Sequence, residues 1–431
     1  MQLILENVRS FCGRHQIPVR PLTLLVGENS TGKSTFLAML AHTSHFSFTS
    51  LRPSFNEEPF NLGTYDSIAT FKGGRYGRAH SFSVGVMNPA GEKGQCIVST
   101  YASYKGQPQL SGLEVKVRGA RIVLSVDPES QRARLQIRVG DTRLEAVQFG
   151  LGTRGEVELE YPATYLIRNY LFEHKLPKGV KKLSRSAEDA LFQMIRYSRG
   201  TARTIVPLAP VRTRPKRTYD VISDEFSPEG DHIPVVLARI IGGEDVAQKQ
   251  RVVKALSEFG AESALFHSIS VKRLGKRPSD PFQILVSLAG PAANLLDVGY
   301  GVSQALPIIV QSILATPAAR YQILFQQPEV HLHPRGQAAL GTFFARLVAR
   351  ENTEFVVETH SDYLVDRVRQ EVARGNIAPT KVLILFFERT GPETAVHQIE
   401  VDRRGNVLGA PEGYRRFFLE EEKNLLMRGS G

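Results

Sequence analysis

Cysteine is scarce in this sequence, since only Cys12 and Cys96 occur in 431 residues. Two cysteines are too few for a disulfide framework or a four-ligand zinc site, so we expect a reducing compartment. Long apolar runs are also missing, because no stretch approaches the roughly 18 residues that a transmembrane helix needs. The first residues, MQLILE, lack the basic and apolar parts of a signal peptide. These absences predict a cytoplasmic protein that is neither secreted nor membrane-bound.

The composition excludes a disordered or fibrous chain. Hydrophobic residues make up 42% and charged residues 23% of the sequence, close to the averages of globular proteins. The length suits two packed modules, or one large domain that carries an insertion. The formal net charge of +11 permits DNA or another polyanion as a partner. Basic residues cluster at 175–185, 212–217 and 272–277, and both solvated loops and phosphate contacts remain possible interpretations of these clusters.

The apolar pattern divides the chain into four segments. Residues 1–75 read as strands, a loop and a helix, with strands expected over 1–11 and 17–26. Residues 76–160 contain short stretches of Val and Ile that alternate with polar residues, which predicts an antiparallel β-rich lobe. Residues 161–280, including helical spacing over 162–198 and a Pro- and Arg-rich connector, predict a helical insertion or arm.

The last segment, residues 281–431, alternates strand and helix patterns. Four apolar stretches read as strands, namely FQILVSL, YQILF, EFVVE and KVLILFF, and helical patterns separate them. Such alternation implies a parallel sheet covered by helices. A closing strand and helix are expected before the terminus.

The strongest motif is a phosphate-binding loop between a predicted strand and a predicted helix. The sequence GENSTGKST matches G-x-x-x-x-G-K-[ST] in full. In such a loop, backbone N–H groups face the phosphates, Lys33 reaches the β- and γ-oxygens, and the Ser34 hydroxyl binds Mg²⁺. We therefore predict ATP and Mg²⁺ as cofactors. The predicted nucleotide-binding residues here are Gly27, Glu28, Asn29, Ser30, Thr31, Gly32, Lys33, Ser34 and Thr35.

Three later segments complement this loop. Residues 321–325 form an apolar strand pattern that runs into QQPEVHLHP, in the place of the second acidic motif of a P-loop ATPase. Residues 297–304, DVGYGVSQ, place a glycine turn and a hydroxyl at the start of a helix, which suits a γ-phosphate. Residues 356–362, VVETHSD, place a histidine at the end of a buried strand.

Together these motifs resemble the ABC-type ATPases of the overcoming-lysogenization-defect (OLD) and AAA-15/AAA-21 group, which are relatives of SMC and RecF proteins. Members carry a GxGxSQ signature, an EPExHLHP box and a THS switch. The resemblance implies an ABC-type P-loop ATPase head, with a mixed or parallel sheet covered by helices, plus the β-rich lobe and the helical insertion. Residues 61–68 resemble the coupling segment that follows the first helix, and residues 209–217 resemble a connector of the same group.

The resemblance also implies an assembly of at least two copies. Two protomers would meet head to tail, with ATP held between the phosphate loop of one subunit and the signature of the other. His360 would contact the γ-phosphate. The signature residues that would close over the partner's nucleotide are Gly299, Gly301, Ser303 and Gln304.

The chain departs from the family pattern where the second acidic motif should end its strand. Gln326 and Gln327 stand in place of the usual carboxylates. A glutamine carbonyl can hold a Mg²⁺-bound water or orient the nucleophile, but it cannot accept the proton. We therefore predict slow hydrolysis, with Gln326 as a metal-shell residue and Gln327 beside the attacking water. Natural variation and an engineered trap both remain open as the origin of the pair.

Neighbouring side chains offer two further hypotheses. Glu329 and Glu358 are the nearest spare carboxylates, and we take Glu329 as the candidate that could replace the missing base. His331 and His333 could be metal ligands, but no third ligand accompanies them at a known spacing. We expect them to shape the dimer-facing loop instead.

No nuclease, zinc or HNH motif is visible, so the chain shows no effector of its own. In this respect it is similar to the ATPase chains of PARIS-like, Septu-like and retron-linked anti-phage systems. The resemblance implies a sensor or regulatory subunit for a separate nuclease or toxin. Two alternatives remain: a RecF- or SMC-like ATP-dependent DNA clamp in repair or maintenance, and a nucleotide-gated scaffold without hydrolysis.

Overall fold

The computed structural model describes residues 1–74, 77–88, 95–117, 120–127, 129–130, 132–139, 142–150, 203–220, 224–288, 290–314, 320–351 and 353–415. The helical pattern over 162–198, the basic cluster at 175–185 and the closing helix lie outside these residues. The chain forms two compact units that interleave in sequence, so the four expected segments stay predictions. The units are Met1–Val19, Ser30–Thr204 and Arg389–Ala395 for the first, and Arg20–Asn29, Ile205–Glu388 and Val396–Gly431 for the second.

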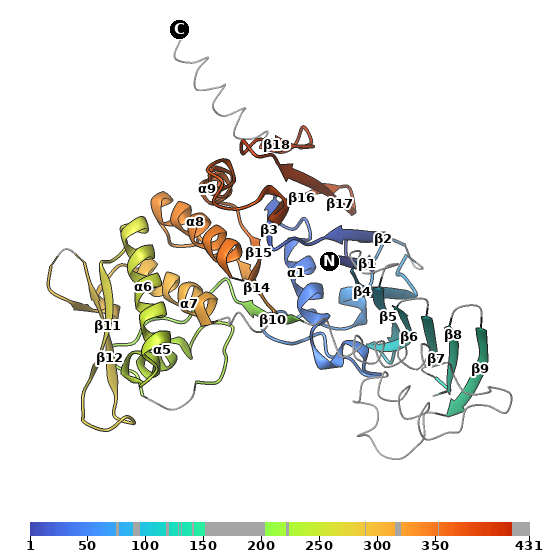
Figure 1. Ribbon diagram of the computed structural model, residues 1–431. Coiled ribbons are helices and arrows are strands. Elements are labelled where there is room, and N and C mark those ends of the chain that lie inside the picture. The colour runs from blue at the N-terminus through green and yellow to red at the C-terminus, as the bar shows by residue number, and fades with distance from the viewer. Residues whose placement is uncertain are drawn as a thin grey trace, which may run out of the picture. The chain divides into compact units, whose positions relative to one another are not determined.

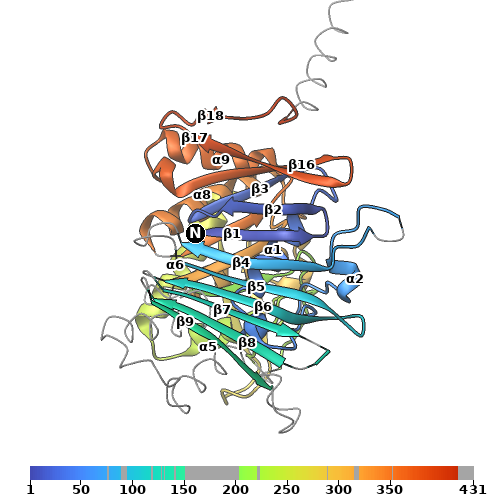
Figure 2. The same ribbon diagram turned by 90° about the vertical axis from the view of Figure 1, so that its right-hand side faces the viewer.

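An eight-stranded antiparallel sheet is the framework of the first unit, in the order β2-β1-β4-β5-β6-β7-β8-β9 (Figure 2). Its strands are β1 (Gln2–Val8), β2 (Phe11–Pro18), β4 (Ser81–Asn88), β5 (Gln95–Tyr104), β6 (Gln107–Val117), β7 (Ala120–Asp127), β8 (Arg132–Val139) and β9 (Thr142–Gly150). Cross-strand apolar pairs hold it together, as where buried Leu113 faces Leu124 and Val115 faces Ile122. The predicted antiparallel β-rich lobe is confirmed as a feature of the fold, and its sheet also includes β1 and β2.

Two expected strands differ in extent from the structure. The strand expected over 1–11 is wrong in extent, because β1 ends at Val8 and a turn leads into β2 at Phe11. The strand expected over 17–26 instead contains the end of β2 and most of β3 (Leu22–Gly27). Pro21 lies between them, and a proline cannot donate a ladder hydrogen bond.

The helix that follows the phosphate loop, α1 (Lys33–His42), belongs to the first unit. Phe36, Leu37, Met39 and Leu40 are fully buried, as their apolar pattern predicts. His42 at its end stacks on Phe55 with ring centroids 4.1 Å apart. Two short helices follow it, η1 (Phe46–Thr49) and α2 (Tyr65–Ile68).

A seven-stranded sheet organises the second unit, in the order β10-β14-β15-β3-β16-β17-β18. Besides β3, its strands are β10 (Arg203–Leu208), β14 (Arg320–Gln326), β15 (Glu354–Glu358), β16 (Val382–Thr390), β17 (Glu393–Val401) and β18 (Val407–Leu408). The neighbours β14, β15, β3 and β16 pair in parallel, which confirms the predicted parallel sheet. The tip between β16 and β17, Arg389–Ala395, counts with the first unit.

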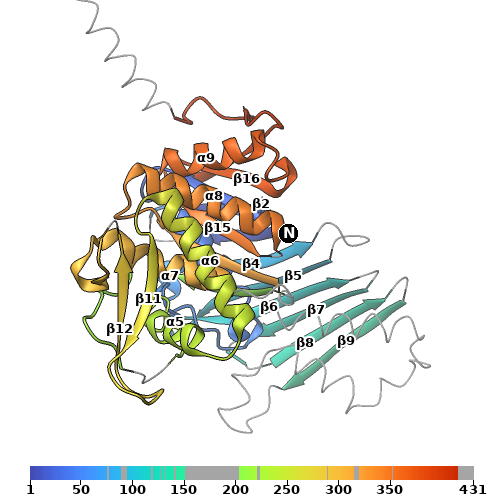
Figure 3. The same cartoon turned by 60° about the vertical axis from the view of Figure 1, so that its left-hand side comes forward.

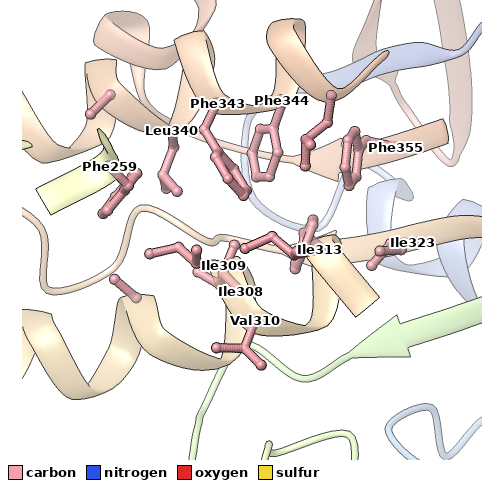
Figure 4. Close-up of a cluster of buried hydrophobic side chains, with 14 of the residues drawn as sticks. Phe259, Ile308, Ile309, Val310, Ile313, Ile323, Leu340, Phe343, Phe344 and Phe355 are labelled. Carbon is pink, nitrogen blue, oxygen red and sulfur yellow. The ribbon is translucent and has the colours of Figure 1, made fainter. Parts of the chain in front are cut away.

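Helices pack with this sheet around the core of the second unit (Figures 1 and 3). They are α5 (Ile233–Gly242), α6 (Val246–Ser263), α7 (Tyr300–Leu314), α8 (Pro334–Arg350) and α9 (Asp362–Ala373), with short turns η3 (Leu295–Asp297) and η4 (Pro379–Lys381). Figure 4 shows Phe259 of α6, Ile309 of α7 and Phe344 of α8 pointing into one cluster. Phe355 of β15 joins them, with its ring centroid 4.9 Å from that of Phe344.

The segment before α7 differs from expectation. The FQILVSL stretch forms β12 (Phe282–Ser287), which pairs antiparallel with β11 (Ser268–Arg273) and β13 (Ala293–Asn294) in a separate small sheet. Its expected place in the parallel sheet is therefore wrong. The burial of β12 alternates along the strand, which is typical of a sheet with one exposed face. The described part of the expected helical insertion likewise contains β10 and β11 besides α5 and α6.

None of the helices in the described ranges is both long and apolar enough to cross a membrane.

Candidate functional site

Four parallel strands of the second unit end at one edge of their sheet. Gln326 at the end of β14 is in register with Glu358 at the end of β15, and Glu358 is in register with Leu25 of β3. On the other side of β3, Phe387 of β16 is in register with Gly27. The first glycine of the phosphate loop, the glutamine pair and the histidine switch therefore leave the same edge, where α/β sheets commonly bind ligands.

The backbone at Gly27 admits no side chain. Its φ is 137°, and a Cβ there would lie 2.2 Å from the Phe387 carbonyl oxygen. Only glycine fits both the conformation and the close approach of β16. Gly27, Glu28 and Asn29 belong to the second unit, whereas the loop from Ser30 onward belongs to the first.

Two side chains of the β16–β17 tip donate hydrogen bonds to backbone carbonyls of the rest of the loop. Thr394 donates its hydroxyl to the Thr31 carbonyl at 2.9 Å, and Arg389 donates to the Ser30 carbonyl at 3.1 Å. Gly32 has a φ of 103° and precedes α1 as its N-cap. A Cβ at Gly32 would be crowded, at 3.1 Å from the Phe11 ring and 3.3 Å from the Thr394 hydroxyl oxygen, and the positive φ already favours glycine. The geometry fits a loop whose N–H groups bind an anion at a helix N-terminus.

The loop residues predicted to contact the phosphates and Mg²⁺ differ in exposure. Lys33 is only 3% exposed, and Ser34 is exposed. Thr35 accepts a hydrogen bond from Arg9 at 3.3 Å. Arg9 was missed by sequence reasoning, and it also donates to the carbonyls of Ser67 and Leu62 at 3.1 and 3.3 Å. It thereby joins the phosphate loop to residues 61–68, the segment that resembles the coupling segment.

The two glutamines occupy different environments after β14. The Nε2 atom of Gln326 is buried and has no hydrogen-bond partner in the described structure. Gln327 adopts a left-handed φ of 45°, and its N–H donates to the Glu358 carbonyl at 2.8 Å. Its own carbonyl accepts from the Val330 N–H at 3.2 Å. The chain therefore turns sharply at Gln327 instead of continuing the strand.

Glu329 holds the histidine switch through the backbone. Its Oε1 accepts the N–H of His360 at 2.7 Å, whereas its Oε2 is buried without a hydrogen-bond partner among the described residues. The residue is 7% exposed. Burial raises the pKa of Glu329, and the bond from His360 and the charge of Arg212 oppose that rise. Ser361 then caps α9 by accepting from the Leu364 N–H at 3.1 Å.

Arg212 is a second residue that sequence reasoning missed as part of the site. It is 2% exposed, and its Nη2 donates to the Gln327 carbonyl at 3.4 Å. Its Nε and Nη1 atoms are buried without hydrogen-bond partners in the described ranges. Burial lowers the pKa of Arg212 to about 10, although the Glu329 charge acts in the opposite direction. The sequence signals were its place in the connector at 209–217 and in the basic cluster at 212–217.

The signature residues lie at the start of α7. Gly299 and Tyr300 are exposed, whereas Ser303 and Gln304 are buried, with Gln304 2% exposed. The Ser303 hydroxyl donates to the Tyr300 carbonyl at 2.7 Å. Gly301 lies close to the box loop, because a Cβ there would be 2.9 Å from the His331 carbonyl oxygen. The glycine end of the motif is therefore the part that faces outward.

The two histidines of the box have structural contacts. The rings of His331 and Tyr300 meet edge-on with centroids 5.0 Å apart. His333 caps α8, and its Nδ1 accepts from the Arg335 N–H at 3.4 Å. Within the described residues no group of three or more His, Cys, Asp or Glu side chains could hold a metal. These contacts agree with the expectation that the pair shapes the loop.

The described basic clusters have different surroundings. In the cluster at 212–217, Arg212 is buried and Arg217 forms a double hydrogen bond with Asp297 at 2.9 and 2.6 Å. In the cluster at 272–277, Lys276 and Arg277 are exposed in the turn after β11. Both clusters present exposed charge, since Arg214 and Lys216 are exposed in the first and Lys276 and Arg277 in the second.

A comparison with protein families identifies the chain. Residues 22–366 match the family described as "AAA domain, putative AbiEii toxin, Type IV TA system". The chain belongs to the AAA_21 family. As an AAA_21 member with this loop and sheet, it is an ABC-type P-loop ATPase. No curated protein matches the chain.

Several solved structures share parts of the architecture of this AAA_21 chain. An SMC head bound to the C-terminal winged-helix domain of ScpA is 14% identical, with a TM-score of 0.45 over 93% of this chain and 97% of that chain. The SMC head domain from Thermotoga maritima is 13% identical, with a TM-score of 0.37 over 93% of this chain and 98% of that chain. An SMC head from Pyrococcus furiosus with an extended coiled coil, bound to the C-terminal domain of ScpA, is 12% identical, with a TM-score of 0.41 over 100% and 99%.

Proposed function

We propose that this AAA_21 protein binds ATP and Mg²⁺, dimerises head to tail around ATP and hydrolyses it slowly. One observation carries the proposal: Gly27, Gln326 and the Glu358–His360 segment leave the same edge of one parallel sheet. The cradle at Gly27, which a Cβ would fill, and the buried Nε2 of Gln326, a donor without a hydrogen-bond partner among the described residues, fit an anion such as phosphate.

The predicted site residues have distinct proposed roles. Lys33 would neutralise the β- and γ-phosphates, and Ser34 and Gln326 would hold Mg²⁺ directly or through its waters. Bound Mg²⁺ supplies charge neutralisation at the phosphates. Gln327 would orient the attacking water without accepting its proton, which costs about 10²–10⁴-fold in rate. The ATP-closed dimer would therefore persist for many times longer than in an ATPase with a carboxylate there.

The contact between Glu329 and His360 supports a sensing role for the histidine. The backbone of His360 is fixed by a 2.7 Å bond to a buried carboxylate, so its position depends on the box loop. His360 would report the γ-phosphate to this loop, and through Tyr300 and His331 to the signature. Glu329 remains the candidate base, but its Oε2 must become accessible before it can meet a water.

We further propose that the ATP-closed dimer is the sensor or regulatory subunit of a separate effector, a nuclease or toxin, in anti-phage defence. The family description supports this, because it names a putative toxin and a type IV TA system. Slow hydrolysis suits a regulatory subunit whose output depends on how long it stays bound to ATP. Membership of the OLD group and of a PARIS-like, Septu-like or retron-linked system is part of this proposal.

A DNA clamp of the RecF or SMC type is the second candidate. The exposed charges of Lys276 and Arg277, in the turn after β11, favour it because such residues can contact phosphates. A clamp should bind duplex DNA with a steep salt dependence and show DNA-stimulated turnover. A sensor should instead depend on a protein partner.

The ATP-dependent dimer is tested by light scattering with and without ATP and Mg²⁺. We expect the parent to dimerise only with nucleotide, and Lys33→Ala to stay monomeric because it has lost the phosphate contact. Calorimetry should show no ATP binding for Lys33→Ala. An ATP affinity equal to that of the parent would refute the role of the phosphate loop.

The effector is tested by affinity purification of the tagged protein from its native host with ATP and Mg²⁺, followed by mass spectrometry. A stoichiometric nuclease- or toxin-like chain that is lost with Lys33→Ala would support the sensor role. Co-elution of DNA alone would favour the clamp, and mutation of Lys276 and Arg277 would then be the next step.

A further inference from the structure

A second polar pocket lies in the second unit, away from the strand edge, and is lined by residues of α6, α8 and α9. Its volume is about 440 Å³, within the range of small-molecule sites. Its lining is mostly charged, and Ala349 is its main apolar contribution. The charged residues that line it are Glu262, Arg346, Arg350, Arg367, Glu371 and Arg374.

The two carboxylates of the pocket are already paired. Arg346 pairs with Glu262 and also with Glu258 of α6 at 2.7 Å. Glu371 is buried and accepts from Arg374 at 3.1 Å. Two of the four arginines are therefore neutralised within the protein.

The other two arginines have no carboxylate partner. Arg367 donates only to the Thr342 hydroxyl, at 3.2 Å, and pairs with no carboxylate among the described residues. Gly341 allows this placement, because a Cβ there would lie 3.0 Å from the Cβ of Arg367 and 2.8 Å from the Leu364 carbonyl oxygen. Arg350 is exposed and has neither an ion-pair nor a hydrogen-bond partner in the part of the chain described. The pocket thus carries two uncompensated positive charges.

Helix stabilisation explains only part of this arrangement. Arg350 is the last residue of α8, and Arg374 is the C-cap of α9, where positive charge stabilises the helix macrodipole. That effect falls off within the last turn. Arg367 lies in the middle of α9 and gains little from it. Helix stabilisation therefore does not explain why Arg367 lines the pocket.

We propose that this pocket binds the phosphate group of a small anionic ligand through Arg350 and Arg367. Guanidinium groups match phosphate oxygens in pairs, and two unpaired cations match the charge of a phosphate monoester. The near absence of apolar lining argues against a site for a nucleobase or an acyl chain.

The pocket is connected to the strand edge by two helices. α8 begins at Pro334, directly after the box, and α9 begins at Asp362, directly after His360 and Ser361. The pocket residues of α8 lie in its C-terminal half, and those of α9 run from Arg367 in its middle to Arg374 at its C-cap. If phosphate binds more tightly to the arrangement of α8 and α9 that ATP also favours, each ligand raises the affinity for the other. Phosphate then changes the affinity for ATP by the same factor by which ATP changes the affinity for phosphate.

The test is calorimetric titration of inorganic phosphate into the full chain, at constant ionic strength, with ADP and Mg²⁺ saturating the phosphate loop. We expect one phosphate site, and a loss of affinity of at least about tenfold in Arg350→Gln and in Arg367→Gln. The matched control is Arg403→Gln, an exposed arginine in the turn after β17, which should bind phosphate as the parent does. Lys33→Ala should also bind phosphate in the pocket, because Lys33 lies in the phosphate loop and not in the pocket lining.

Three results would overturn the proposal. They are no phosphate binding by the ADP-loaded parent, unchanged binding in both arginine variants, and binding of succinate in preference to phosphate. If Arg367→Gln fails to fold, Arg350→Gln still decides the question, since its side chain is exposed at a helix end. Glucose 6-phosphate and AMP then separate a sugar-phosphate source from a nucleotide source.

Discussion

Replacing Arg212 by methionine tests whether a buried charge is kept at the site for function. Arg212 is 2% exposed, makes one long hydrogen bond to Gln327, and leaves two nitrogens unsatisfied. Methionine of similar length removes those unsatisfied donors, which favours folding. It also removes the positive charge nearest to Glu329, which opposes folding.

Protonation of Glu329 limits how much stability the loss of the Arg212 charge can cost. A buried Glu329 without its cation can take up a proton, and the cost at pH 7 is set by the distance from the ordinary pKa of 4.5. At about 1.36 kcal/mol per pH unit, that cost is at most about 3.4 kcal/mol at pH 7 and below about 1 kcal/mol at pH 5. The destabilisation in Arg212→Met should therefore shrink as pH falls.

Urea unfolding at pH 5 and pH 7 measures this difference. We expect Arg212→Met to lose stability at pH 7 and to match or exceed the parent at pH 5. The double variant Arg212→Met/Glu329→Gln should recover most of the loss at pH 7, because no buried carboxylate remains. Arg403→Met serves as the exposed control. A loss that is equal at both pH values, or that persists in the double variant, would refute the electrostatic reasoning.

Three further predictions address the base, the switch loop and the first unit. Gln327→Glu should raise steady-state phosphate release by about 10²–10⁴-fold with unchanged ATP affinity, and no acceleration would place water activation elsewhere. Glu329→Gln should lower turnover by about 10²–10⁴-fold, since an amide cannot accept a proton although its carbonyl can still accept the His360 N–H; unchanged turnover would show that Glu329 is not the base. Burial lowers the pKa of His42 to about 3, so the unfolded chain binds a proton that the folded chain excludes, and stability should fall as pH drops below 6.5. His42→Gln should flatten that fall in urea titrations between pH 7.5 and pH 5, and an unchanged slope would contradict the assigned cause.

Local patterns were sufficient for the phosphate loop and for the parallel strands. The loop needs only its own glycines and the flanking strand and helix, and Gly27 and Gly32 both adopt left-handed conformations. The strands β14, β15 and β16 are continuous apolar runs, which is typical of strands that are buried on both faces. The β12 stretch looked the same in length and composition. It joins another sheet because its partners, β11 and β13, are set by pairing that no single stretch encodes.

Arg212 and Arg9 were missed for the same reason, because their contacts are distant in sequence. Arg212 acts on Gln327 across 115 residues of sequence, and Arg9 acts on Thr35 across 26. Neither arginine stands in a spacing pattern, and each is recognisable only after the chain has folded around it. The glutamine pair was visible at once, because its departure from a family pattern is local.

The connector at residues 209–217 contacts two different parts of the predicted ATP site. Arg212 reaches the Gln327 carbonyl at the end of β14, and Arg217, five positions later, binds Asp297 directly before the signature. Asn294 also donates to the Arg217 carbonyl at 2.9 Å. One short segment therefore contacts both the loop that would sense the subunit's own nucleotide and the turn that would face the partner's nucleotide. In a head-to-tail dimer, such a segment is the shortest route by which occupancy of one ATP site could bias closure over the other, and Arg217→Gln should weaken that cooperativity while leaving ATP affinity of the monomer unchanged.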